Sequence, residues 1–295
     1  RDAWMGWDIP DVIQQNQGDT QKMKQLAILS GKGGTGKTSI TACFAVLAKD
    51  AVLVDCDVDA PDLHMLLHPE VNKETEFIAS KIAIIDETKC TKCGLCREKC
   101  KFDAINEKLE IVAIACEGCG VCEFICPTKA ITLAPRVSGK SYVSKIKYGL
   151  MSHALLFPGE SNSGKLVTLI RQNAKVLAEK AEKNLIIIDG SPGIGCPVIA
   201  SITGVDAALV ITEPTMSGIH DLERVLKLLE HFNVVPFVCI NMYDVNVNNT
   251  NRILSYCREK SIEVIGVIPF DPIVTQAMVN GKTIIEYSPD SAVSG

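Results

Sequence analysis

Short runs of apolar residues, several of them ending at an acidic or small residue, recur along this chain. They cover residues 26–30, 51–55, 185–189, 207–212, 235–240 and 264–268. Almost every position in these runs is apolar, which is typical of strands that are covered on both faces. The pattern therefore predicts buried strands of a parallel sheet.

Helical patterns lie between several of these runs. They cover residues 37–49, 164–183, 219–232 and 248–260. In the second of them, Leu166, Leu169, Ile170 and Leu177 share one side, and polar residues 161–163 precede it as candidate caps. Strands that alternate with helices predict an α/β fold with a doubly wound, mostly parallel sheet.

The alternation stops between residues 81 and 135, where cysteines and short turns replace it. Because the α/β pattern resumes afterwards, we interpret 81–135 as a small inserted α+β domain. The main domain then has two parts, 23–80 and 136–295. Residues 1–22 have no usable periodicity, so we interpret them as a tag or a disordered extension.

Composition narrows the class of protein. The chain has 295 residues, 47% hydrophobic and 22% charged, with a formal net charge of −5. The acidic balance disfavours nucleic acid as a partner. No apolar run approaches the roughly 18 residues of a membrane span, and no secretory signal is recognisable. We expect a cytoplasmic protein that binds neither nucleic acid nor membrane.

A phosphate-binding motif follows the first predicted strand and opens the first predicted helix. The pattern G-x-x-x-x-G-K-[S/T] is met by Gly31, Lys32, Gly33, Gly34, Thr35, Gly36, Lys37 and Thr38, and Ser39 follows. Backbone N–H groups of such a loop surround phosphate oxygens. We expect Lys37 to reach the β- and γ-phosphates and Thr38 to bind Mg²⁺. A glycine-rich turn without nucleotide is the alternative.

The second lysine of this loop, Lys32, makes the motif resemble a known variant. It is similar to the deviant Walker A signature K-G-G-x-G-K-[S/T] of the MinD, ParA and nitrogenase iron protein superfamily of P-loop ATPases. In that superfamily the lysine contacts the nucleotide of the partner subunit. The resemblance implies a homodimer on ATP binding, with Lys32 and Lys37 in catalytic roles. From charge alone, Lys32 is only a cation beside a phosphate site.

Carboxylates follow two other predicted strands. Asp55, Asp57 and Asp59 alternate after one strand, and Asp189 ends another before a turn to Gly193. A Mg–ATP site needs one carboxylate to order the metal and another to orient the attacking water. By resemblance to the superfamily's switch segments, Asp57 would activate water, while Asp55 and Asp189 would hold Mg²⁺. Helix capping is the alternative for Asp189, and simple solvation for Asp59.

Two more strand ends resemble the base-binding positions of the superfamily. Asn241 closes one predicted strand, and Pro269 follows another. We interpret both as contacts to adenine, and ordinary strand-end loops are the alternative.

Eight of the 13 cysteines form two copies of the pattern C-x2-C-x2-C-x3-C in the insert. This spacing resembles bacterial ferredoxins, in which three close thiolates bind one [4Fe–4S] cluster and the fourth binds the other. The resemblance implies one cluster on Cys90, Cys93, Cys96 and Cys126, and a second on Cys100, Cys116, Cys119 and Cys122. Structural zinc is the competitor, but its paired C-x2-C knuckles do not explain this longer pattern twice.

Cys196 lies seven residues after Asp189. The nitrogenase iron protein carries a ligand of a subunit-bridging cluster at the corresponding place, but a second ligand has no counterpart here. A bridging cluster is therefore one hypothesis for this residue. The other cysteines, Cys43, Cys56, Cys239 and Cys257, are expected to be small buried side chains.

From Met23 nearly to the C-terminus, the chain resembles MinD-superfamily ATPases that contain an inserted ferredoxin domain. The resemblance implies ATP, Mg²⁺ and two [4Fe–4S] clusters as cofactors. Our first interpretation is ATP-gated electron transfer to a redox or metallocluster partner, driven by closure of the dimer. The alternatives are ATP-dependent assembly or delivery of metal clusters, and positioning of the MinD or ParA kind. The loop 158–165 is a candidate partner contact.

Overall fold

One sheet of nine strands organises residues 23–295, the part of the chain that the computed structural model describes. Its strand order is β3-β4-β5-β2-β6-β1-β7-β8-β9. The six predicted strands are all present and parallel to their neighbours: β1 (Lys24–Ser30), β2 (Ala51–Asp55), β6 (Leu185–Asp189), β7 (Ala207–Thr212), β8 (Val235–Asn241) and β9 (Glu263–Ile268). The prediction of a mostly parallel α/β sheet is confirmed. The extension predicted for residues 1–22 lies outside the described residues.

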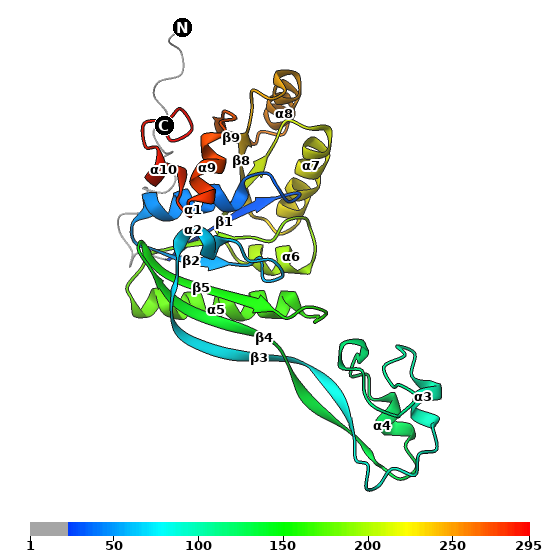
Figure 1. Ribbon diagram of the computed structural model, residues 1–295. Helices are drawn as coiled ribbons and strands as arrows, with labels where there is room; N and C mark the ends of the chain where they lie inside the picture. The colour runs from blue at the N-terminus through cyan, green and yellow to red at the C-terminus, as the bar shows by residue number, and fades with distance from the viewer. Residues whose placement is uncertain (1–22) are drawn as a thin grey trace.

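Helices cover both faces of this sheet (Figure 1). One face holds α1 (Lys37–Ala48), α2 (Leu63–Leu67), α9 (Ile273–Val279) and α10 (Ile284–Tyr287), and the other holds α5 (Ser163–Lys180), α6 (Cys196–Ile202), α7 (Met216–His231) and α8 (Val247–Glu259). The four predicted helices correspond to α1, α5, α7 and α8. No helix among the described residues is both long and apolar enough to cross a membrane.

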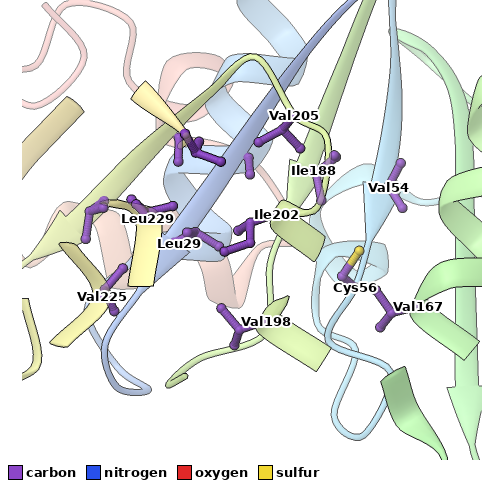
Figure 2. Close-up of a cluster of buried hydrophobic side chains, with 14 of the residues drawn as sticks. Leu29, Val54, Cys56, Val167, Ile188, Val198, Ile202, Val205, Val225 and Leu229 are labelled. Carbon is purple, nitrogen blue, oxygen red and sulfur yellow. The ribbon is translucent and has the colours of Figure 1, made fainter. Parts of the chain in front are cut away.

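Each central strand contributes side chains to two hydrophobic cores, because successive side chains point to opposite faces of the sheet. Leu29 belongs to the core under α5–α7, where Val167, Val198 and Val225 also lie (Figure 2). Its neighbour Ile28 belongs to the other core, beside α1. Burial on both faces explains why these strands have no polar alternation in the sequence.

Two long antiparallel strands, β3 (Glu70–Ile85) and β4 (Ile131–Ile146), leave the sheet together as a ribbon (Figure 1). β4 then pairs with β5 (Gly149–Leu156), which returns to the sheet beside β2. The predicted domain boundaries, after residue 80 and before residue 136, therefore fall inside β3 and β4. The first seven residues of β3 are exposed and mostly polar, so the sequence shows no apolar run over that half of the strand.

The cysteine insert lies at the far end of this ribbon (Figure 1). It contains two five-residue helices, α3 (Leu95–Lys99) and α4 (Val121–Ile125), and a 3₁₀ turn (Ala113–Ala115). Each short helix follows the second cysteine of its run and ends directly before the fourth. The two copies of the sequence motif thus fold alike. We call residues 86–130 the cysteine module.

Candidate functional site

The phosphate loop and the predicted carboxylates meet at one edge of the sheet. Residues 31–36 join β1 to α1, Asp55 ends β2 and Asp189 ends β6. β6 pairs with both β1 and β2, and Asp55 and Asp189 are register partners in this parallel ladder. The carboxyl ends of parallel strands share one side of the sheet, where such folds bind their ligands.

Three side chains of α1 bind Asp189. The ammonium of Lys37 lies 2.6 Å from Oδ1. The hydroxyl of Thr41 donates to the same oxygen at 2.8 Å, and the hydroxyl of Thr38 donates to Oδ2 at 2.9 Å. Lys37 and Asp189 are both buried, so each ion depends on the other for compensation. Thr41 is a site residue that the sequence interpretation missed, although it stands one helical turn after Lys37.

Two buried oxygens at this site have no hydrogen-bond partner among the described residues. They are Oδ2 of Asp55 and the hydroxyl of Thr35. Burial, followed by the charge of Asp189, raises the pKa of Asp55 well above its ordinary value. Buried polar atoms are normally satisfied. The two oxygens therefore fit a site that a bound cation and phosphate group would complete.

Asp57 lies two residues beyond β2, and its backbone N–H donates to Asp55 Oδ1 at 3.1 Å. It is half-buried, whereas Asp59 is exposed. Burial raises the pKa of Asp57, against the opposing charge of Lys37. The structure thus brings Asp55, Asp57 and Asp189 together around Lys37 and leaves Asp59 in solvent.

The segment after Asp189 is bonded to both neighbouring strand ends. Gly193 N–H donates to the Ser30 carbonyl at 2.9 Å. The hydroxyl of Ser191 donates to the Cys56 carbonyl at 2.6 Å. Hydrogen bonds therefore connect residues 190–193 to the start of the phosphate loop and to the segment after β2.

Lys32 is bound within its own chain. Its ammonium lies 2.5 Å from Glu213 Oε1 and donates to the Ser217 hydroxyl at 3.1 Å. These partners lie after β7, far from Lys32 in the sequence, and the sequence interpretation did not foresee the pair. Lys32 must leave Glu213 before it can reach another subunit.

Both predicted base contacts lie beside the loop. The side-chain amide of Asn241 donates to the Thr35 carbonyl at 2.9 Å. Asn241 pairs with Ile268 in the β8–β9 ladder, which places Pro269 next to it. Ser39 contributes a contact to α9, where its hydroxyl lies 3.4 Å from the sulfur of Met278. The candidate base-binding edge is thus continuous with the phosphate loop.

The cysteines of each run influence one another electrostatically. Burial raises the pKa of Cys96 and of Cys122, and the first two cysteines of the same run raise each value further. A cavity of about 210 Å³ is lined by the four residues Cys100, Cys116, Cys119 and Cys122, among others. This is the set that the ferredoxin spacing assigned to the second cluster. Within residues 23–295, no three ligating side chains converge on a position for a single metal ion.

The remaining cysteines are free thiols as well. Cys56, Cys239 and Cys257 are buried as expected, whereas Cys43, which lies against α10, is only partly buried. Cys196 is exposed at the start of α6. Among residues 23–295, Cys196 belongs to no group of three or more ligating side chains that could hold a metal ion.

Comparison with known proteins points to one family. The sequence profile described as "CobQ/CobB/MinD/ParA nucleotide binding domain" matches residues 26–284. An uncharacterized protein of Methanocaldococcus jannaschii is 39% identical over 259 residues, which cover 87% of this chain and 88% of that protein.

Solved structures show the same fold. The septum site-determining protein MinD of Pyrococcus horikoshii, complexed with Mg-ADP, has a TM-score of 0.56 at 16% identity, covering 92% of this chain and 91% of that one. A chain of the MinC:MinD cell division protein complex of Aquifex aeolicus has a TM-score of 0.52 at 22% identity, covering 92% and 91%.

Proposed function

Since the chain belongs to the CobQ/CobB/MinD/ParA family of nucleotide-binding domains, we propose that it is a Mg–ATP-hydrolysing switch that closes into a homodimer. The observation that carries this proposal is the buried group of Lys37, Thr38 and Asp189, beside the two unpartnered oxygens of Thr35 and Asp55. Among the interpretations from the sequence, the relatives favour the alternative of a positioning ATPase of the MinD or ParA kind over gated electron transfer.

Each residue of the site has a role that follows from its position. Backbone N–H groups of the loop and the ammonium of Lys37 bind the β- and γ-phosphates. Thr38, Asp55 and Asp189 would hold Mg²⁺, which would supply positive charge to the phosphates. Lys37 now neutralises Asp189, so it exchanges this carboxylate for phosphate when nucleotide and metal bind together. Asp57 orients the attacking water and accepts its proton.

Substitution of Asp57 by Asn tests this assignment. We expect Asp57→Asn to bind Mg–ATP as the parent does and to hydrolyse it about 100-fold more slowly, since the general base is lost. Phosphate release and titration with a fluorescent ATP analogue measure the two quantities. Asp59→Asn is the matched control, because Asp59 is exposed, and should leave both unchanged. Equal hydrolysis by Asp57→Asn and the parent contradicts the assignment, and absent Mg–ATP binding contradicts the proposed function.

A redox output is the second candidate, supported by the cavity lined by Cys100, Cys116, Cys119 and Cys122. Four cysteines in the wall of one cavity suit an iron–sulfur cluster, because soft sulfur ligands bind iron clusters well. Such clusters supply one-electron transfer when bound. We therefore propose that the cysteine module holds two [4Fe–4S] clusters and contacts a redox partner. Assembly or delivery of clusters, the remaining alternative, has no comparable support.

A further inference from the structure

The residues on either side of the loop 157–162, between β5 and α5, contact the two segments that follow the site carboxylates. Before the loop, Leu156 N–H donates to the Val58 carbonyl at 2.9 Å, three residues beyond Asp55. After the loop, Gly164 packs against Cys196, so that a Cβ added to Gly164 would lie 3.4 Å from that of Cys196. Cys196 follows the segment that starts at Asp189. A movement of either segment therefore displaces the loop.

The same loop holds the cysteine module. The carboxylate of Glu160 forms an ion pair with the guanidinium of Arg136 on β4. Arg136 also donates to the Ala113 carbonyl at 2.6 Å and to the Cys116 carbonyl at 3.5 Å. Ser80 on β3 donates to the second oxygen of Glu160 at 3.1 Å. The Glu160 side chain is only 5% exposed, so separating the pair would leave a buried charge without compensation.

Around this ion pair the junction is partly hollow. A cavity of about 470 Å³ lies between the ribbon, the loop and the second cysteine run, with Lys81, Glu117 and Asn162 in its wall. Close packing resists small displacements, whereas a hollow junction accommodates them. The module can therefore shift against the main domain, with Arg136 and Glu160 as the connection that moves with the loop.

We propose that Arg136 and Glu160 are positioning residues that couple the nucleotide state to the second cysteine run. The inference rests on the proposed function, since it requires nucleotide to move the segments after Asp55 and Asp189. The loop moves with these segments, and the ion pair makes Arg136 follow Glu160. Through its hydrogen bonds, Arg136 then shifts the backbone at Ala113 and Cys116. The nucleotide site and the second cysteine run would thus both act on the loop 157–162. Physical coupling requires such a shared element.

Hydrogen–deuterium exchange of the full chain tests this coupling without any dependence on activity. Exchange is compared with and without Mg²⁺ and a slowly hydrolysed ATP analogue. In the parent we expect nucleotide to change exchange at residues 31–38, and at residues 113–118 by about fivefold or more. In Glu160→Gln and Arg136→Gln the change at 113–118 should disappear while that at 31–38 remains. Arg136→Lys, which keeps the positive charge, should retain part of the nucleotide-dependent change at residues 113–118.

An ion pair elsewhere in the cysteine module provides the control for this experiment. Arg97→Gln removes an exposed ion pair with Glu107 inside the module, and it should keep the full response. A response at 113–118 that is absent in the parent, or that persists in the folded Gln variants, overturns the inference. No response at 31–38 in the parent instead contradicts the proposed function. If Glu160→Gln does not fold, Arg136→Gln decides, because Arg136 is less buried.

Discussion

At the scale of single residues, Gly36 shows how closely the phosphate loop is fitted to its surroundings. Its φ of +86° lies in the left-handed region, and a Cβ there would lie 2.4 Å from the side-chain nitrogen of Asn241. That nitrogen donates to the neighbouring carbonyl of Thr35. The glycine is therefore required both by the turn and by the contact that joins the loop to the candidate base-binding edge.

Substitution of Gly36 by Ala is expected to destabilise the protein by about 1–3 kcal/mol, the usual cost of forcing a side chain into this backbone region. It should also weaken nucleotide binding, because Asn241 is displaced. Thermal unfolding and nucleotide titration measure the two effects. Gly33→Ala in the same loop is the control for stability, since nothing lies within 4 Å of the added Cβ. Equal losses of stability in the two variants would refute this explanation.

At the scale of elements, the cysteine module is two copies of one short structure. In each copy a five-residue helix ends before the last cysteine of its run, which lies in extended backbone. The Cys126 thiol accepts a hydrogen bond from Ala130 N–H at 3.2 Å. Cys100, by contrast, lines the cavity together with three cysteines of the other run. The position of Cys100 supports an arrangement in which the fourth cysteine of each run binds the cluster of the other run.

Substitution of the fourth cysteine in each run tests this ligand arrangement. Parent protein prepared anaerobically should contain about eight irons per chain, and Cys100→Ala about four, with the loss confined to the cluster of the second run. Cys126→Ala should lose the other cluster. Iron and sulfide analysis with electron paramagnetic resonance distinguishes the two, and Cys43→Ala, on α1, should change neither. Zinc in place of iron, or unchanged spectra in Cys100→Ala, would exclude this ligand assignment.

At the scale of the whole molecule, Lys32 is the residue that would contact the second subunit of the proposed dimer. Glu213 holds its ammonium at 2.5 Å, and the Lys32 side chain remains 31% exposed. The Glu213 side chain is only 12% exposed, so its carboxylate loses a compensating charge when Lys32 turns away. A nucleotide phosphate on another subunit would have to replace this interaction for Lys32.

Lys32→Ala should abolish ATP-dependent dimerisation and leave the monomer able to bind nucleotide. Glu213→Gln releases Lys32 from its ion pair, so it should dimerise with ATP at least as well as the parent. Analytical ultracentrifugation with ATP and with ADP, in the slowly hydrolysing Asp57→Asn background, measures both. A Lys32→Ala variant that dimerises like its parent removes this residue from the interface.

The sequence by itself determined the local features of this protein. Strands β1, β2 and β6 to β9, four helices and the phosphate loop all follow from apolar runs, helical spacing and glycine positions within short stretches. The site carboxylates followed as well, because parallel strands end on one side of a sheet. The ribbon β3–β4 escaped prediction, since the first half of β3 is polar and exposed and β4 mixes polar with apolar residues.

Only the tertiary structure decided which distant residues meet. Lys32 finds Glu213, Thr41 reaches Asp189, and Arg136 joins Glu160 to the second cysteine run. Each contact depends on how helices and loops pack around the sheet, and a charged or polar residue has many possible partners of the right chemistry. Spacing along the chain can specify a loop or a ligand run, but the choice among remote partners is made by folding.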